Sequence, residues 1–134
     1  MGRALVAYYQ GSGNPRVLAA LTRVYGKFPV EDLSPTFYKV SGAVNLDAMS
    51  DTYRMSGDPT ILQNILAFAA RSSYRATADA WVECHLETGH NVIFYEHVRP
   101  PAMLYPWTGN PRDLAATVAG LSWNDRNNLF THRS

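Results

Sequence analysis

Apolar residues recur at intervals of three and four in three stretches of this chain, which is the spacing of one face of an α-helix. Each stretch follows a proline, so three amphipathic helices are predicted to begin at Pro15, Pro59 and Pro111. Their apolar positions are Val17, Leu18, Leu21, Val24 and Tyr25, then Ile61, Leu62, Ile65, Leu66 and Ala69, then Leu114, Ala115, Val118 and Leu121. Shorter apolar patterns before these prolines, Leu5 to Tyr9 and Leu46 to Tyr53, fit the ends of preceding helices.

One local motif precedes each of these apolar faces. It reads Tyr-x-x-(Ser/Thr)-Gly-(Asn/Asp)-Pro-x-x-Leu at residues 9–18, 53–62 and 105–114. The glycine can take the left-handed conformation that ends a helix. The Asn or Asp can cap the next helix, and the proline fits its first position. Each copy therefore predicts an αα-hairpin, in which we expect the tyrosine and the leucine to touch as scaffold residues.

The segments between the motifs are less regular. Residues 26–44 contain Pro29, Pro35 and Gly42 and are predicted to form a loop. Residues 72–91 show no clear periodicity, and long irregular segments in helical proteins are often functional. A helix is expected near 91–99, with a break at Pro100-Pro101 and a short helical stretch to about Trp107. The polar stretch from Trp123 onward is expected to fray.

These elements predict an all-α fold, a helical hairpin array in one domain over residues 1–134. The motif glycines Gly13, Gly57 and Gly109 are 44 and then 52 residues apart. These periods are unequal and longer than the roughly 34 residues of a tetratricopeptide repeat. They fit part of an (α/α) toroid better, in which inner and outer helices alternate. The chain has material for about six helices, half of such a ring.

Composition and charge exclude several classes of function. The formal net charge is +1 and the 12 basic residues are scattered, so no nucleic-acid partner is predicted. The single cysteine, Cys84, cannot build a disulfide framework or a four-thiolate zinc site. No apolar run approaches the ~20 residues that cross a bilayer, so no membrane contact is predicted. The N-terminus lacks the features of a signal peptide, and a soluble, cytoplasmic protein is expected. No cofactor is predicted.

Three segments resemble, in order, the β-L-arabinofuranosidase-like glycoside hydrolases (glycoside hydrolase family 127 and relatives), which form (α/α)6 barrels. That family has segments of the type "ayyqatGdpRvLdal", "GadNL…lY..tGDp" and "HgvN…Pa.lY.ltGd". The matching residues here are Ala7–Leu18, Gly42–Leu46 with Tyr53 and Ser56–Pro59, and Glu87–Val92 with Pro101–Tyr105 and Thr108–Asn110. The resemblance runs from about residue 4 to residue 121.

The resemblance implies a carbohydrate-related protein without the family's catalytic half. The family uses zinc held by thiolates and a glutamate, a cysteine nucleophile and a glutamate acid/base. Its Glu-x-Cys motif is absent, because Glu83 directly precedes Cys84. Its paired-cysteine motif is absent, because Cys84 is the single cysteine. No catalytic residue is therefore assigned, and whether the chain is an enzyme stays open. His90 is the family-matched position, and the resemblance implies that it contacts sugar.

The densest cluster of reactive residue types runs from Trp81 to Asn91. Trp81 is a candidate to stack on a sugar face or, alternatively, a core-edge aromatic. His90 either contacts a ligand or stabilises a helix N-terminus, and Asn45 either caps a helix or lines the inner surface. The tentative substrate-binding set is His90, Trp81, Asn45, Asn91 and His85.

Other chemistry in this cluster is disfavoured. A zinc site of Cys84, His85 and His90 is not predicted, since the adjacent Cys84 and His85 side chains tend to point apart. Glu83 and Glu87 are four apart and would share a helix face, either as an acid–base pair or, as we favour, as a solvated acidic surface.

Two functions follow. The first is a glycoside-hydrolase-like toroid segment that binds carbohydrate, without hydrolysis by the monomer. The alternative is a helical-repeat module for protein interaction or self-assembly. The second is favoured by the chain start, where Leu5, Val6 and Tyr8 offer no polar cap to the array. Self-association is predicted on that basis.

Overall fold

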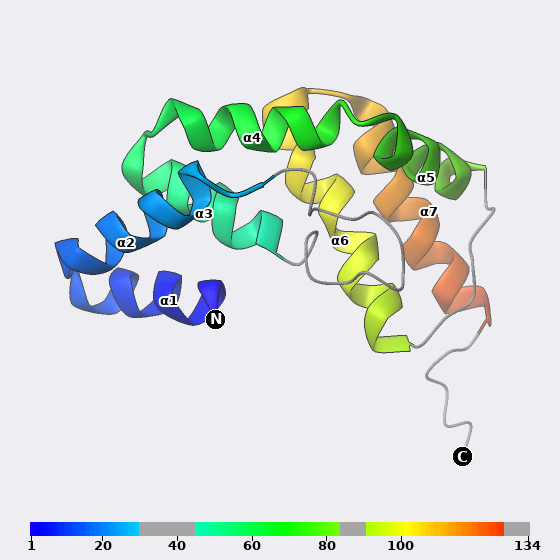
Figure 1. Cartoon of the computed structure of the whole chain (residues 1–134). Helices are drawn as coiled ribbons and strands as arrows, with labels where there is room; N and C mark the ends of the chain where they lie inside the picture. The colour runs from blue at the N-terminus through cyan, green and yellow to red at the C-terminus, as the bar shows by residue number, and fades with distance from the viewer. Residues whose placement is uncertain (30–44, 84–90, 128–134) are drawn as a thin grey trace, which may run out of the picture.

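A computed structural model describes residues 1–29, 45–83 and 91–127, without the side chains of residues 91–97, 124 and 127. These residues form seven α-helices and, within the described ranges, no strand (Figure 1). The helices are α1 (Gly2–Ser12), α2 (Pro15–Gly26), α3 (Leu46–Ser56), α4 (Pro59–Ala69), α5 (Ser72–Val82), α6 (Asn91–Thr108) and α7 (Pro111–Asn127). The prediction of an all-α hairpin array is confirmed.

The three predicted turns share one set of hydrogen bonds. The motif glycines adopt positive φ angles of 63°, 68° and 62°, and each glycine N–H donates to the motif tyrosine carbonyl at 2.7–2.9 Å. The next residue caps the following helix through its side chain, accepting from the N–H two residues on at 2.9–3.1 Å. Its own N–H donates to the motif Ser or Thr hydroxyl at 3.2 Å. Hairpins α1–α2, α3–α4 and α6–α7 follow.

The hairpins pack side by side, with α5 closing one end (Figure 1). Helix α3 packs against α1, α2, α4 and α6, and α6 packs against α3, α4 and α7. Fully buried side chains from these central helices form the middle of the core: Leu46, Met49, Ile61, Ile65, Phe68, Val98 and Leu104. The three hairpins therefore pack in chain order, whereas α5 packs mainly against α7.

Polar contacts tie successive hairpins together. The Asn64 amide of α4 donates to the Tyr25 carbonyl at the end of α2 at 3.0 Å, and the Phe28 N–H donates to the same carbonyl at 3.4 Å. The Trp107 indole N–H donates to the Ser50 hydroxyl at 3.2 Å, and its ring meets Tyr53 edge-on at 5.1 Å. These directional contacts join α4 to α2 and α6 to α3, in addition to the apolar packing between the hairpins.

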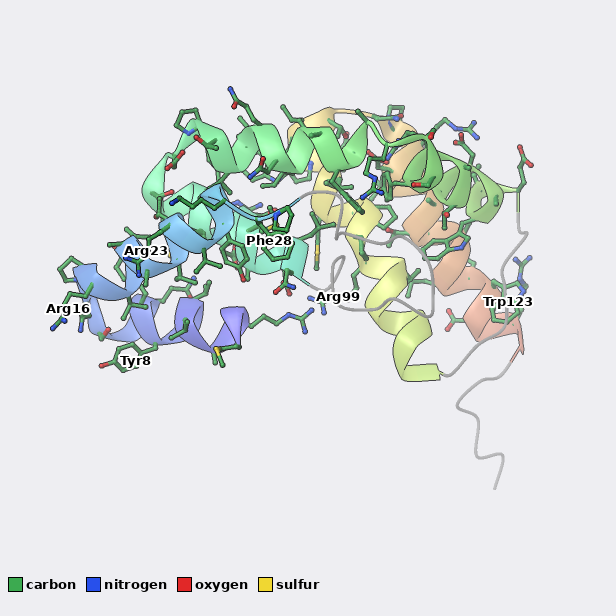
Figure 2. The ribbon with its side chains drawn as sticks, viewed as in Figure 1. Tyr8, Arg16, Arg23, Phe28, Arg99 and Trp123 are labelled. Atoms are coloured by element: carbon green, nitrogen blue, oxygen red, sulfur yellow. The ribbon has the colours of Figure 1, made fainter. Side chains whose placement is uncertain are left out.

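An ion cluster links three helices on another face of the array. Asp47 of α3 pairs with Arg3 of α1 and with Arg99 of α6, the latter at 3.3 Å. Figure 2 places Arg99 beside α6, on the side that faces α3. The Asp47 side chain is only 15% exposed, so this cluster is more sheltered than an ordinary surface pair.

One expectation about the linkers is wrong. Residues 72–82, expected to be irregular, form α5. Its buried positions Tyr74, Ala78 and Trp81 have helical spacing, but small and polar residues around them hide the pattern. The stretch expected to fray is helical in α7 from Trp123 as far as Asn127, and residues 128–134 lie outside the described residues. The loop predicted over residues 26–44 lies mostly outside the described residues.

The break predicted at Pro100-Pro101 is also wrong, because α6 runs through both prolines. Proline in a helix interior removes a hydrogen bond at a cost of roughly 3 kcal/mol. The neighbouring helix braces this segment: the Ala102 N–H donates to Thr117 Oγ1 of α7 at 3.0 Å, and that hydroxyl donates to the Val98 carbonyl at 2.8 Å. Thr117 thus bridges two backbone groups that lie on either side of the prolines, and both prolines are buried in the core.

The described helices form an arc in which α1 and α7 lie at opposite ends (Figure 1). Membership of a closed (α/α) toroid stays a prediction. Among the described helices, the outer sides of the two terminal hairpins have no neighbouring hairpin.

Candidate functional site

The residues predicted to bind sugar do not come together in the described structure. Trp81 is 4% exposed and belongs to the hydrophobic core, so its ring is covered and the sugar-stacking interpretation is corrected to the core one. His85 and His90 lie outside the described residues. Asn91 is the first residue of α6, and its side chain is likewise outside them.

Asn45 lies in a different part of the fold. It does not cap α3 through its side chain; it accepts a hydrogen bond from the Tyr25 hydroxyl at 3.5 Å. Both residues line a pocket of about 220 Å³, otherwise mainly apolar, between α1 and α2. Burial, and then the nearby Asp47 carboxylate, raises the pKa of Tyr25. Trp81 lies on α5, which packs against α4 and α7, and it does not line this pocket.

The described carboxylates are mostly engaged in structural contacts. Asp51 pairs with Arg54, Asp79 pairs with Arg112, and Asp58 caps α4. Within residues 1–29, 45–83 and 91–127 no group of histidine, cysteine, aspartate or glutamate could hold a metal ion. In the same ranges no helix is long and apolar enough to cross a membrane.

Asp113 is the one carboxylate that the described structure buries completely. It lies in the first turn of α7 and accepts hydrogen bonds from the Thr108 hydroxyl at 2.7 Å and from the Tyr74 hydroxyl at 3.3 Å. It also pairs with Arg75, whose guanidinium lies 4.4 Å from the Tyr74 ring centroid. Partners from α5 and α6 thus fasten α5 to the α6–α7 hairpin through one side chain.

Burial, and then the Asp113 carboxylate, raises the pKa of Tyr74 well above its usual range. The folded state therefore keeps a proton that the unfolded state releases above about pH 10. We expect the contribution of Tyr74 to the free energy of unfolding to be constant below that pH. Above it, this contribution should fall by about 1.4 kcal/mol per pH unit. Urea unfolding between pH 8 and pH 11 measures this slope. Tyr74→Phe should flatten it, whereas Tyr8→Phe at an exposed site should not; equal slopes in all three proteins would contradict the assignment.

The outward face of α7 carries several exposed aliphatic side chains. The sequence predicts one apolar face on this helix, yet its large aliphatic residues point away from the core: Leu114, Val118 and Leu121 are 44%, 56% and 42% exposed. We expected Leu114 to pack against Tyr105 inside the hairpin. In the structure both side chains are exposed, and Tyr105 is 40% exposed. The positions of α7 that are buried are Asp113, Ala116 and Gly120.

Two polar anchors explain this orientation. Asp113 and Thr117 are four residues apart and share a helix face, and both bond inward, to the Tyr74–Arg75–Thr108 cluster and to α6. Ala116 and Gly120 let α7 approach its neighbours closely. Once these contacts fix the rotation of α7, the aliphatic residues on its other side must face outward. We call Leu114, Ala115, Val118 and Leu121 the α7 stripe.

The α7 stripe is bordered by charges at its two ends only. Arg112 lies before it and pairs with the exposed Asp79 at 2.6 Å, and Asp125 and Arg126 lie after it. Every exposed residue between Arg112 and Asp125 is uncharged: Leu114, Ala115, Val118, Leu121 and Ser122. A contiguous apolar strip with a charged rim is the usual anatomy of a protein-interaction surface. The sequence carried this signal in the uncharged run from Leu114 to Trp123, but not the direction in which it points.

The chain matches no protein-family model, and no curated protein or solved structure is significantly similar to it. The resemblance to the arabinofuranosidase-like hydrolases stays a prediction, and the functional argument depends on the surfaces of this chain.

Proposed function

We propose that this protein is a helical hairpin-repeat module for assembly, and that a second copy of the same chain docks on the α7 stripe. The observation that carries the proposal is the outward orientation of Leu114, Val118 and Leu121. Burying three aliphatic side chains that are about half exposed is favourable at roughly 25 cal/mol per Å² of apolar surface. The polar anchors on the inner side prevent α7 from hiding these residues by rotating.

A second copy suits this surface because the stripe is complementary to itself. Val118 lies between Leu114 and Leu121, so an antiparallel copy of α7 presents the same apolar order in reverse. In such a pair the two helix dipoles also run in opposite directions. A two-fold interface requires this kind of self-complementarity.

We expect light scattering to give a particle of twice the 14.9 kDa chain mass at concentrations above the dissociation constant. A single helix face makes a small interface, so that constant is expected on the order of micromolar. Val118→Glu places two carboxylates against each other at the two-fold axis, and should raise the dissociation constant by more than about tenfold.

The matched control is Val24→Glu on α2, because Val24 is 54% exposed and Val118 is 56% exposed. It should leave the dimer intact. Dissociation by Val24→Glu alone would move the interface to the other end of the arc, and a monomer at all accessible concentrations would refute the proposal. In a Cys84→Ser background, Val118→Cys should form an intermolecular disulfide under mild oxidation, whereas Val24→Cys should not.

A carbohydrate-related function remains a separate prediction from the sequence resemblance. Its candidate residues His85, His90 and Asn91 have no described side chains, and it predicts binding of an arabinofuranoside without hydrolysis by the monomer. The α7 stripe does not depend on it, because no predicted sugar-binding residue belongs to the stripe.

A further inference from the structure

The basic residues of the first hairpin are not balanced by acidic ones. Residues 1–29 contain Arg3, Arg16, Arg23 and Lys27 and no acidic residue, whereas residues 30–134 contain eight basic and eleven acidic residues, a formal charge of −3. The net charge of +1 therefore conceals a separation of charge along the chain. Arg3 pairs with Asp47, but no ion pair in the described ranges involves Arg16, Arg23 or Lys27.

Two of these cations line a groove of about 880 Å³ between α2 and the α3–α4 turn. Arg23 and Lys27 contribute from α2, as do Thr22 and Gly26. Figure 2 shows Arg16 near the start of α2 and Arg23 further along the same helix. Arg16 is not part of the groove lining.

The rest of the groove is largely apolar. Its lining includes Pro15, Leu18 and Ala19 of α2, and Met55 and Pro59 from the facing turn. Asp58 is its one acidic lining residue, and the carboxylate is occupied in capping α4 at 2.9 Å. Methionine and leucine accommodate aliphatic side chains of varied shape. The groove thus combines an apolar floor with two cations that have no ion-pair partner among the described residues.

This combination distinguishes between anionic partners. Sites for single-stranded nucleic acids combine cations along the phosphates with aromatic rings that stack on the bases, and the groove lining contains no aromatic residue. An acidic peptide segment that also carries aliphatic side chains uses both features, since its carboxylates meet Arg23 and Lys27 while its apolar residues enter the floor. We infer that the α2 groove is a docking site for an acidic, amphipathic peptide segment of a partner protein.

The test uses the whole chain and a fluorescein-labelled synthetic peptide with leucine at every third or fourth position and glutamate between them. Fluorescence anisotropy should detect binding that weakens as salt is added. Arg23→Glu should weaken it roughly tenfold. The matched control is Arg16→Glu, the same change on the same helix outside the groove, which should weaken binding less than about threefold.

A second variant tests the floor without changing charge. Ala19 is exposed in the groove, so Ala19→Phe fills the floor and should weaken peptide binding while leaving Arg23 and Lys27 in place. Circular dichroism should confirm that all three variants keep the wild-type fold. Equal weakening by Arg16→Glu and Arg23→Glu would mean only diffuse electrostatic attraction to α2, and would overturn the inference. So would tighter binding of an oligothymidylate than of the peptide, or no binding of the peptide at all.

Discussion

Replacing Asp113 by alanine is expected to lower the free energy of unfolding by about 3 kcal/mol, the largest effect of any single change considered for this protein. The substitution removes the acceptor shared by Tyr74, Arg75 and Thr108. Tyr74 is 4% exposed, so its hydroxyl would be left without that partner in the interior. Arg75 would lose its carboxylate partner while its side chain is only 24% exposed. Urea unfolding followed by circular dichroism measures the loss.

The structure provides a matched control for this prediction. Asp79 also pairs with an arginine, Arg112, but the two side chains are 44% and 51% exposed. Exposed ion pairs contribute little, so Asp79→Ala should cost on the order of 0.5 kcal/mol. If Asp113→Ala cost no more than Asp79→Ala, the buried cluster would not hold α5 against the third hairpin.

Replacing Thr117 by valine is expected to cost about 2 kcal/mol. Valine has nearly the shape of threonine but no hydroxyl, so the Ala102 N–H and the Val98 carbonyl both lose their hydrogen bond to α7. Val98 is 1% exposed, so little water reaches this part of α6 to replace the lost bonds. The adjacent prolines add no N–H groups that would repair the helix. Urea unfolding again gives the magnitude.

Two controls separate the hydroxyl bridge from general effects of the substitution. Thr117→Ser keeps the hydroxyl and should cost less than half as much as Thr117→Val. Thr77 donates to the Ser73 carbonyl of its own helix at 3.0 Å, at an exposed site, so Thr77→Val should be close to neutral. A neutral Thr117→Val would show that α6 reforms its own hydrogen bond in spite of the prolines.

The candidate sites were less predictable from the sequence than the turns. The sequence left two interpretations of Trp81 open, a platform for sugar stacking or a core residue. Its burial in the structure supports the core interpretation. Periodicity identified the apolar face of α7 but not its direction, because Asp113 and Thr117 fix that direction through partners on α5 and α6. The basic groove was missed, since net charge averages over the chain and the groove also needs the α3–α4 turn opposite α2.

The sequence by itself determined the three hairpins. Glycine with positive φ, an Asn or Asp cap and a first-turn proline act within a few residues, so their effect does not depend on the rest of the fold. Only the tertiary structure decided that α6 passes through Pro100 and Pro101, that α5 is a helix, and that the α7 stripe faces outward. Each of these depends on contacts between helices, such as the hydroxyl of Thr117 or the carboxylate of Asp113, whose energies outweigh local preference.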